Sequence, residues 1–527
     1  MAGALAGLAA AAAAVGVGEP VAVVTGPYSA PVDAVGSAAI DLSPAWLKEY
    51  AIRTFGTDDK PVLLAGIYLT MALLAVLAGL LAVRQPAAGA AVFAVFGGVG
   101  GWAALSRPGA TGSAVAPAVA AGTVGAAAVL LLARLLRSAT PSPPAVQPAE
   151  APAEAPADPA RPGEEHPTGT TSRRTVLAAT GGTLALAALV GSGGRLLSDR
   201  RYDIDAARAA VRIPPPATPL PPLPAAAHPA DAPGLSPFTT PTADFYRVDT
   251  ALTLPRIDPR HWSLRIHGMV DHPLVLDFDD LLRLPLEELD HTLSCVSNEV
   301  GGPYVGTTRW LGASLPALLR RAGVRPGADQ LVGRSQDGMT IGTPLEAVLD
   351  GRRALLAVAM NGEAMPVAHG FPCRSVVPGL YGYASATKWL VDLDVTTFAA
   401  YDPYWVRRGW DRCGEVRTAS RIEIPAPFAR IPAGDVTLAG TAWATHRGIA
   451  AVEVRVDGGP WQVARLAADA GPDLWRQWTH TWAGAPPGTH RIEVRATDAT
   501  GAVQGEQRAG PFPAGATGWH STVVTVT

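Results

Sequence analysis

Cysteine is scarce in this chain of 527 residues, which contains only Cys295, Cys373 and Cys413. Three cysteines are too few for a disulfide framework, and their spacing does not fit a zinc site. The formal net charge of −3 is close to neutral for this length. A nucleic-acid-binding domain usually has a clear excess of lysine and arginine, so the composition argues against a nucleic-acid partner.

Histidine is absent before His166. Membrane segments in the first part of the chain therefore have no imidazole with which to bind a haem b. The chain also contains no Cys-x-x-Cys-His sequence, which is the signature of c-type haem attachment. We therefore expect any electrons to be exchanged with a separate membrane or soluble electron-transfer protein.

Charged residues are rare at the start of the sequence, where long apolar runs follow one another. Four runs, at 2–27, 61–83, 87–105 and 114–136, have the roughly 20 apolar residues that a transmembrane helix needs. The alternative for the first run is a cleaved signal peptide, but no basic residues precede it. The sequence predicts a transmembrane helical region over 1–137 with about four spans, in contact with membrane lipid.

Residues 138–172 are rich in proline, alanine and glutamate, a composition typical of a disordered linker. The next segment, 173–195, begins with Arg173 and Arg174 and continues into a mildly apolar run. This is a twin-arginine-like export pattern and also a candidate fifth transmembrane segment. The arginines should remain in the cytoplasm. The protein is therefore predicted to be a multi-pass protein of the cell membrane whose remaining residues are extracytoplasmic.

The rest of the chain reads as a linker and two domains. Residues 196–235 form a second, proline-rich linker. Short strand-like runs mixed with helices predict an α+β domain over 236–425. About seven short strands with intervening turn signals predict an all-β, Ig-like sandwich over 426–527. That segment has no cysteine, so no disulfide joins its sheets. The fold class is therefore multi-domain.

Cys295 lies in the stretch His-Thr-Leu-Ser-Cys-Val-Ser-Asn-Glu-Val-Gly-Gly, which runs from His291 to Gly302. An alternating apolar run precedes the cysteine and turn-forming residues follow it, so Cys295 should lie where a strand opens into a loop. A thiolate is a soft ligand for a redox metal. Taken alone, the pattern also fits a cysteine that is buried as a small hydrophobic residue.

A second stretch of sequence helps to interpret Cys295. It reads His-Gly-Phe-Pro-Cys-Arg-Ser-Val-Val-Pro-Gly from His369 to Gly379, and Lys388-Trp389 follows. In this order, the motifs resemble the molybdenum-cofactor domain of the sulfite oxidase family, in which a strand-end cysteine binds molybdenum. The resemblance covers about 244–397. It implies an α+β domain of sulfite-oxidase type and an oxidoreductase that uses molybdenum-molybdopterin (Mo-MPT).

The resemblance also implies roles for individual residues. Cys295 would bind molybdenum, and Trp310 would lie beside the metal pocket. His369 and Arg374 suit the phosphate or the pterin, because both side chains can donate hydrogen bonds to an anion. The backbone amides of 385–387 would lie near the pterin. The full cofactor-binding set would be Tyr246, Arg247, Cys295, His369, Arg374, Ser385, Thr387 and Lys388.

Positive charge is missing from part of the substrate site that the resemblance implies. Sulfite oxidases have an anion-binding arginine where this chain has Val248. They also have a pair of arginines where this chain has Glu299 and Val300. A carboxylate in place of a guanidinium should repel a dianion. The pocket is therefore expected to retain the cofactor residues but only part of the sulfite site.

The remaining catalytic candidates come from later in the chain. Arg447 matches the substrate-site arginine that the second domain contributes in the family. Tyr401 and Tyr404 are candidates for the active-site phenol. Together with Cys295 and Trp310, the residues Arg447 and Tyr401 form the catalytic set that the resemblance implies.

These features predict oxygen-atom transfer on a small sulfur oxyanion, as in sulfite oxidases. One alternative is reduction of a sulfoxide of the methionine-sulfoxide type, because such reductases of the superfamily also lack the missing arginines. A further alternative is a non-catalytic membrane receptor that has lost the metal. The second domain mediates dimerisation in the family, which implies a homodimer through residues 426–527.

Overall fold

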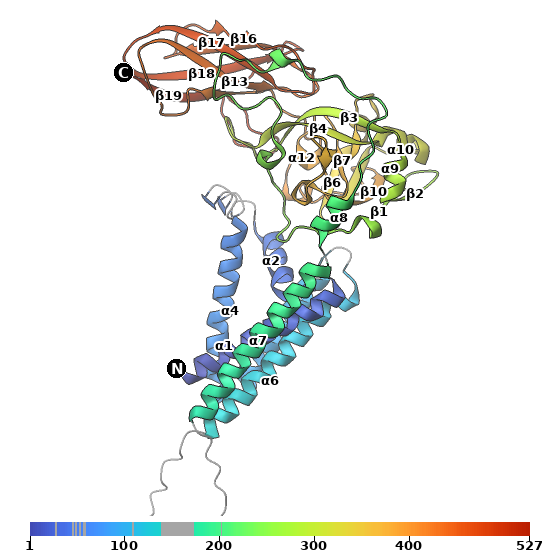
Figure 1. Cartoon of the computed structure of the whole chain (residues 1–527), viewed down its shortest axis with the longest axis vertical. Helices are drawn as coiled ribbons and strands as arrows, with labels where there is room; N and C mark the ends of the chain where they lie inside the picture. The colour runs from blue at the N-terminus through green and yellow to red at the C-terminus, as the bar shows by residue number, and fades with distance from the viewer. Residues whose placement is uncertain are drawn as a thin grey trace, which may run out of the picture. The chain divides into compact units, whose positions relative to one another are not determined.

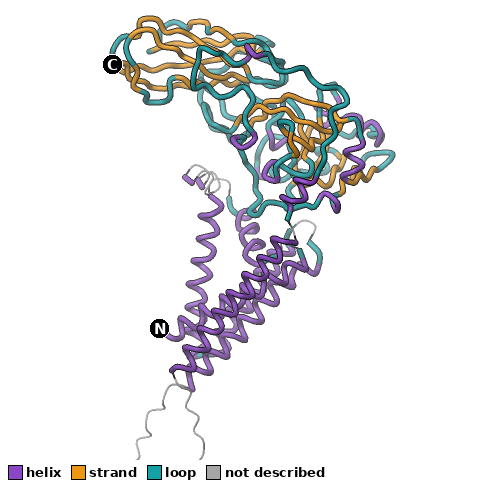
Figure 2. Tube along the Cα trace, viewed as in Figure 1, coloured by secondary structure: helices purple, strands orange, loops and turns teal. Residues whose placement is uncertain are grey.

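The computed structural model describes residues 1–26, 29–44, 47, 50–51, 54–55, 59–107, 110–138, 173–201 and 203–527. These residues form two compact units, Met1–Arg201 and Tyr202–Thr527. The predicted linker 138–172 lies, apart from Ser138, outside the described residues. Figure 2 shows the division in content, with long helices in the first unit and the described strands in the second.

The first unit is helical, as its content of alanine, leucine and valine predicts. Within the described residues, five helical stretches are long and apolar enough to cross a membrane. They correspond to the five apolar runs found in the sequence, and their helical structure is confirmed (Figure 1). The longer helices of this unit are α1 (Ala2–Thr25), α2 (Pro31–Leu42), α4 (Asp59–Arg84), α5 (Pro86–Leu105), α6 (Ala116–Ser138) and α7 (Arg173–Arg201).

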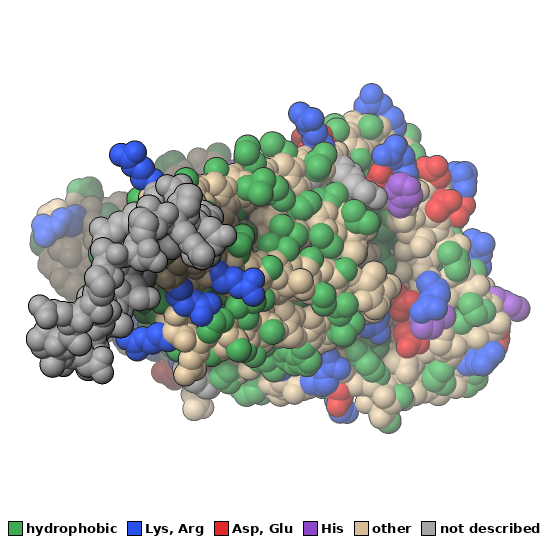
Figure 3. All heavy atoms as spheres, turned by 90° about the horizontal axis from the view of Figure 1, so that it is seen from below, with side chains coloured by type: hydrophobic (Ala, Val, Ile, Leu, Met, Phe, Trp, Pro, Cys, Tyr) green, Lys and Arg blue, Asp and Glu red, His purple; other side chains and the backbone are tan. Residues whose placement is uncertain are grey.

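Large apolar side chains lie on the outside of these helices. On α4, Leu69 and Leu73 are more than 60% exposed, and Leu77 and Leu80 are 47% exposed. Their spacing of three or four residues places them on one face of the helix. Figure 3 shows a broad area of hydrophobic side chains with few charged ones. A soluble protein rarely exposes so continuous an apolar surface, whereas lipid would cover it without cost.

The second unit begins with a segment that differs from the predicted linker of 196–235. Helix α8 (Ile204–Ala210) packs Ile204 into a hydrophobic cluster. Arg208 donates hydrogen bonds to the carbonyls of Ala364 and Met365, at 2.6 and 2.9 Å. Beyond α8, the amide of Ala217 donates to the carbonyl of Leu286 at 2.8 Å. The proline-rich chain is thus extended, as expected, but it lies against the domain surface.

Two mixed layers of strands and short helices follow. The helices are α9 (Phe278–Arg283), α10 (Leu315–Ala322), α11 (Leu345–Leu349) and α12 (Gly382–Ser385). The strands are β1 (Ser263–Gly268), β2 (Leu274–Asp277), β3 (Leu286–Ser294), β4 (Val305–Ser314), β5 (Gln330–Ser335), β6 (Thr340–Pro344), β7 (Leu355–Met360), β8 (Glu363–Ala364), β9 (Arg374–Val376) and β10 (Leu390–Thr396). The predicted α+β character of this domain is confirmed.

These strands form two sheets. One has the order β2-β1-β10-β5-β6, and only its β1–β10 pair is parallel. The other has the order β3-β4-β7-β8, with β9 also paired to β7, and is antiparallel throughout. Strand β3 lies at the edge of this second sheet and ends at Ser294, immediately before Cys295.

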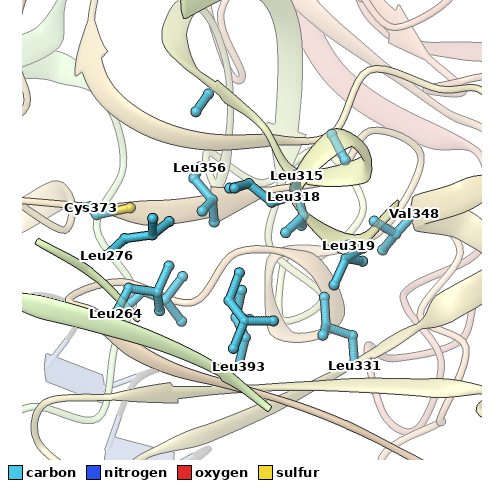
Figure 4. Close-up of a cluster of buried hydrophobic side chains, with 14 of the residues drawn as sticks. Leu264, Leu276, Leu315, Leu318, Leu319, Leu331, Val348, Leu356, Cys373 and Leu393 are labelled. Carbon is cyan, nitrogen blue, oxygen red and sulfur yellow. The ribbon is translucent and has the colours of Figure 1, made fainter. Parts of the chain in front are cut away.

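A leucine-rich core joins the first sheet to helix α10 (Figure 4). Leu315, Leu318 and Leu319 of α10 are at most 3% exposed, because the spacing of three and four residues places them on one helix face. Leu393 of β10 points into the same core. Cys373 is also a member of this cluster and is fully buried. It therefore behaves as a small hydrophobic side chain.

The C-terminal part is a sandwich of two sheets. Its strands are β11 (Ala419–Ile424), β12 (Arg430–Ile431), β13 (Gly434–Trp443), β14 (Ile449–Val456), β15 (Gln462–Val463), β16 (Arg465–Leu466), β17 (Arg476–Ala485), β18 (Gly488–Asp498) and β19 (His520–Val526). The sheet orders are β11-β13-β17-β16 and β12-β19-β18-β14-β15. Leu438 and Trp478 from one sheet meet Val494 and Val524 from the other in a buried core. Strand β11 pairs with β13, so the sandwich begins before the predicted boundary at 426.

Substitution of Leu393 by alanine should lower the free energy of unfolding by about 2–5 kcal/mol, because it leaves a cavity in the core of the first domain. Denaturant unfolding of the full chain in detergent, followed by tryptophan fluorescence, measures this change. Val275→Ala in neighbouring β2 is the control, since Val275 is 67% exposed and its truncation should change stability by less than about 0.5 kcal/mol. Equal effects of the two substitutions would contradict this core.

Candidate functional site

Cys295 is presented by a closed loop at the end of β3. Its amide donates to the carbonyl of Tyr304 at 2.9 Å, and its carbonyl accepts from the amide of Asn298 at 3.1 Å. The side-chain oxygen of Asn298 accepts from the amide of Tyr304 at 2.8 Å. The loop reverses at Gly301, whose φ of +81° is accessible to glycine without strain. The predicted strand-end position of Cys295 is confirmed.

The thiol of Cys295 has polar neighbours and no carboxylate partner among the described residues. Its sulfur lies 2.9 Å from the hydroxyl oxygen of Ser297. Burial raises the pKa of the Cys295 thiol, while the hydrogen bond with Ser297 and the charge of Lys388 act in the opposite direction. A bound cation would favour the thiolate further. The side chain is partly exposed, so it remains available to a ligand.

Arg374 carries a positive charge into the interior of the domain. It is 2% exposed, and no described carboxylate pairs with it. Its Nη1 donates to the carbonyl of His369 at 3.0 Å, and its guanidinium lies 4.8 Å from the centre of the Trp310 ring. The Nε of Arg374 has no hydrogen-bond partner. Burial lowers the pKa of Arg374 to about 10, so the charge is retained at neutral pH.

His369 lies in the same enclosed region. It is 6% exposed, and its ring packs edge-on against Phe245 at a centroid distance of 5.6 Å. Burial, together with the charges of Lys388 and Arg374, lowers the pKa of His369 to about 3. The imidazole is therefore neutral, and its Nδ1 has no hydrogen-bond partner. A neutral imidazole can donate one hydrogen bond and accept another.

A small ionic network stands beside these residues. Lys388 donates from Nζ to Asp249 at 3.0 Å and to the carbonyl of Ala368 at 3.1 Å. Arg247 donates from Nε to the same carboxylate oxygen of Asp249 at 2.8 Å. Burial lowers the pKa of Lys388 to about 8, although Asp249 opposes this shift. The cation is thus held rigidly and is mostly charged at neutral pH.

The charges of this region fit an anionic group with phosphate character. Arg247, Arg374 and Lys388 supply three positive charges, and Asp249 supplies one negative charge, which leaves two positive charges among these four side chains. A phosphate monoester carries about −1.5 to −2 at neutral pH. Buried donors without partners are costly, and such atoms gather here on His369, Arg374 and Trp310. The residues present therefore fit the predicted molybdopterin.

Ser385 and Thr387 both make hydrogen bonds within the chain around α12. The hydroxyl of Ser385 donates to the carbonyls of Leu380 and Tyr381 at 3.2 and 3.0 Å. The amide of Thr387 donates to the hydroxyl of Ser375 at 2.9 Å. These donors stabilise the chain around α12. Their contribution to a cofactor site, which remains a prediction, would have to use other atoms.

Tyr401 and Tyr404 make contacts of their own. The hydroxyl of Tyr401 donates to Thr340 at 3.2 Å, and the Tyr404 ring lies 3.5 Å from the guanidinium of Arg408. Trp310 is fully buried and therefore supports Arg374 within the core. The phenols of Tyr246 and Tyr381 lie within electrostatic range of Cys295. Burial raises the pKa of both phenols, which keeps them protonated.

Arg447 is held by the sandwich. Its Nε donates to Asp498 at 3.0 Å, and its Nη2 donates to the carbonyl of Val416 at 2.9 Å and to Thr418 at 3.1 Å. Burial opposes ionisation of Asp498, but hydrogen bonds from Thr500, Arg447 and Thr418 outweigh it and lower the pKa of Asp498 to about 2. The charge of Arg447 is thus balanced by a permanent carboxylate.

Sequence reasoning missed three polar residues of this region. Asp249 and Tyr381 were not singled out, although both are near residues that were. His291 is fully buried, and its Nε2 has no partner. Burial and the charge of Arg374, partly offset by Asp473, lower the pKa of His291 to about 4. Its position in the strand, four residues before Cys295, was the available signal.

Comparison with known proteins agrees with this geometry. A family model described as an oxidoreductase molybdopterin binding domain matches residues 251–405. An uncharacterized oxidoreductase of Bacillus subtilis, YuiH, is 34% identical over 158 residues, which are 30% of this chain and 76% of that protein.

Two sulfite oxidases are also similar to this chain. The mitochondrial enzyme of Mus musculus is 32% identical over 290 residues, covering 46% of this chain and 52% of that protein. The enzyme of Gallus gallus is 32% identical over 292 residues, covering 46% of this chain and 63% of that protein. The chain thus spans between about half and two thirds of their lengths.

Among solved structures, the sulfane dehydrogenase SoxCD from Paracoccus pantotrophus is similar with a TM-score of 0.48 and 25% identity. The match covers 56% of this chain and 84% of that chain.

Arg374→Met should have opposite effects on stability and on cofactor content. Because the guanidinium is buried without a carboxylate, its replacement by an apolar side chain should raise the free energy of unfolding of the cofactor-free chain by roughly 1–3 kcal/mol. Molybdopterin content of the loaded protein should fall close to zero, because the anion loses its buried counter-charge. Denaturant unfolding and pterin fluorescence after extraction measure the two effects.

The matched control is Arg352→Met. The side chain of Arg352 is 12% exposed and pairs with Asp350 at 2.6 Å, so its loss should lower stability and leave the pterin content unchanged. A destabilised Arg374→Met chain that retains its pterin would show that Arg374 has a structural role alone.

Proposed function

Because the chain belongs to the sulfite oxidase superfamily of molybdopterin-dependent oxidoreductases, we propose that it is a membrane-anchored, extracytoplasmic enzyme that transfers an oxygen atom to or from a small sulfur compound. The observation that carries this proposal is the buried Arg374. Its charge has no carboxylate partner within the part of the chain that the structure describes, and it lies beside the neutral His369. A pocket of this kind favours an anionic organic group over water. Cys295 supplies a soft ligand within electrostatic range of Lys388 in the same region.

The cofactor of this superfamily is molybdenum bound by molybdopterin, which supplies the oxygen-atom transfer when it is bound. In this chain, Arg374 and Lys388 would bind the phosphate, with Arg247 keeping Asp249 and Lys388 in place. His369 would donate or accept a hydrogen bond at the pterin, and Cys295 would bind the metal. Tyr246 and Tyr381 would offer protonated phenols on the side of Cys295, where they could donate hydrogen bonds to an oxygen of the substrate.

The helices support a membrane location for the enzyme. Five spans would place the two ends of the helical unit on opposite sides of the membrane. Arg84, Arg134, Arg137 and the pair Arg173–Arg174 would then lie in the cytoplasm. Because Lys48, Arg53, Lys60 and Arg107 would lie outside, the positive-inside bias is modest. The twin-arginine-like start of α7 agrees with export of a domain that has already folded around its cofactor. Electrons would leave through a separate protein, and the Ig-like sandwich would mediate a homodimer.

The decisive experiment is metal analysis of the protein purified from membranes of a host that makes the cofactor. We expect about one molybdenum per chain in the native protein and a loss of at least tenfold in Cys295→Ala, because the cysteine supplies the protein's direct bond to the metal. Cys413→Ser is the matched control, since Cys413 is exposed and should not affect metal content. A well-folded native chain without molybdenum would contradict the enzyme and favour a receptor.

Reduction of an uncharged sulfoxide is a second candidate reaction, and one contact favours it. Arg447 would be the anion-binding arginine of a sulfite site, but Asp498 neutralises its charge at 3.0 Å. Neither Val248 nor Glu299 restores a positive charge. A dianion would therefore gain little electrostatic attraction near Cys295, whereas an uncharged sulfoxide needs only hydrogen-bond donors, such as the two phenols.

Asp498→Asn separates the two reactions. The oxygen Oδ1 of Asp498 accepts from Thr500 and Ala502, and Oδ2 accepts from Arg447 and Thr418. The side-chain oxygen of an asparagine can still accept from the amides of Thr500 and Ala502. An asparagine is uncharged, however, so it no longer neutralises Arg447. The KM for sulfite should fall about tenfold, which corresponds to about 1.4 kcal/mol, and the KM for a sulfoxide should stay unchanged. Glu493→Gln, which alters the partner of Arg455, is the control.

Kinetics with sulfite and with methionine sulfoxide, measured with artificial electron acceptors and donors, test both reactions. A native enzyme that oxidises sulfite efficiently, with a KM that Asp498→Asn does not change, would contradict the role given to the Arg447–Asp498 pair.

A further inference from the structure

The loop that presents Cys295 is contacted by the C-terminal sandwich. Arg421 of β11 donates from Nη1 to the carbonyl of Gly302 at 3.0 Å. Val296, which follows Cys295, packs in a hydrophobic cluster with Trp443 and Trp475 of the sandwich. The loop is thus fixed at its own ends by β3 and β4 and from outside by the second domain.

The guanidinium of Arg421 is also held by Glu423, a residue of the same strand. Its Nε and Nη2 donate to one oxygen of Glu423 at 3.2 and 2.8 Å. Glu423 also accepts from the amide of Ser236 at 3.0 Å and from the hydroxyl of Thr441 at 2.9 Å. The side chains of Arg421 and Glu423 are about 12% exposed. A guanidinium held in this way loses little further side-chain entropy when it binds the loop carbonyl.

His520 of β19 closes the other side of the loop. Its Nδ1 accepts a hydrogen bond from the amide of Ile422 at 3.0 Å, which assigns the ring proton to Nε2 in the neutral form. The ring lies so close to Gly301 that a Cβ atom on this glycine would overlap it. Gly301 also has a positive φ. A glycine is therefore required at position 301 for the observed packing.

We infer that Arg421 and His520 are positioning residues for Cys295, so that the C-terminal sandwich helps to hold the cysteine of the first domain in place. The clamp consists of Arg421, His520 and the two glycines that they contact, Gly301 and Gly302. Its importance for metal binding rests on the proposed function. Its effect on the cysteine itself does not, because it can be measured in the absence of the cofactor.

The test is the rate of Cys295 alkylation by iodoacetamide in the full, cofactor-free chain in detergent. A Cys413→Ser background removes the exposed thiol, and Cys373 is fully buried. Arg421→Ala should accelerate alkylation of Cys295 about tenfold or more, because loss of a hydrogen bond from a charged donor lets the loop open more often. Arg421→Lys should give an intermediate rate, since an ammonium group can still reach one of the two partners.

Arg455→Ala is the matched control. Arg455 also belongs to the sandwich and also pairs with a glutamate, Glu493 at 2.7 Å. Its guanidinium stacks on Trp461 and Trp519, and among the described residues none of its hydrogen bonds or ion pairs reaches Gly301 or Gly302. Its alkylation rate should equal that of the parent. Thermal unfolding of each variant identifies global destabilisation. An unchanged alkylation rate in Arg421→Ala, or an equal acceleration in Arg455→Ala, would overturn the inference.

A second pair of variants tests His520 independently. Gly301→Ala should accelerate alkylation, because the new methyl group overlaps the imidazole and displaces the loop. Adding His520→Ala removes the overlap and should restore part of the parent rate, although the positive φ remains unfavourable for alanine. If the effects of Gly301→Ala and His520→Ala on the alkylation rate simply multiply, the His520 ring does not contact the loop in solution.

The loaded protein separates this inference from the proposed function. If Cys295→Ala retained its molybdenum, the proposed ligand would be wrong while the alkylation results could still stand. If Cys295 is the ligand, Arg421→Ala should shift the reduction potential of the bound molybdenum, whereas Arg455→Ala should not. If Arg421→Ala instead leaves the reduction potential unchanged while it accelerates alkylation tenfold, the clamp positions Cys295 only in the cofactor-free chain. Its proposed role at the metal would then be overturned.

Discussion

Arg374 brings a full positive charge into the interior of the first domain, and the surrounding structure is arranged to tolerate it. The ring of Trp310 faces the guanidinium, and the carbonyl of His369 accepts one of its hydrogen bonds. His369 in turn remains neutral because it is buried and lies beside the cations Lys388 and Arg374, which together lower its pKa. Removal of water from these groups is costly unless an anion takes its place. The pocket is therefore most favourable when its ligand is present.

The cysteine end of the pocket follows a different principle. Cys295 and Asn298 are positioned by backbone hydrogen bonds within one loop. Contacts from the sandwich, including the packing of Val296, fix that loop from outside. Charges are balanced there, as the pair of Arg447 and Asp498 shows. One end of the site thus concentrates positive charge, while the other offers a soft ligand and neutral donors. This division agrees with an anionic cofactor and a small substrate.

Local sequence patterns predicted much of this arrangement. The strand-end position of Cys295 follows from alternation and turn residues, and His369, Arg374 and Lys388 follow from ordered motifs. Asp249, Tyr381 and Asp498 could not be predicted in the same way, because their roles depend on partners far along the chain. The backbone amide of Thr387 was expected near the pterin, but in this structure it donates to the hydroxyl of Ser375. Proline content predicted an extended chain before residue 236 without revealing the surface on which it lies.

That extended chain has a consequence for strand β3. An edge strand exposes amide and carbonyl groups that can pair with a strand of another molecule and start aggregation. Here, the amide of Ala217 binds the carbonyl of Leu286 near one end of β3, and the carbonyl of Asp473 accepts from Thr292 near the other. Two distant segments of the same chain therefore occupy the positions that an intruding strand would need. The strand that carries the cysteine is protected from misassembly by its own polypeptide.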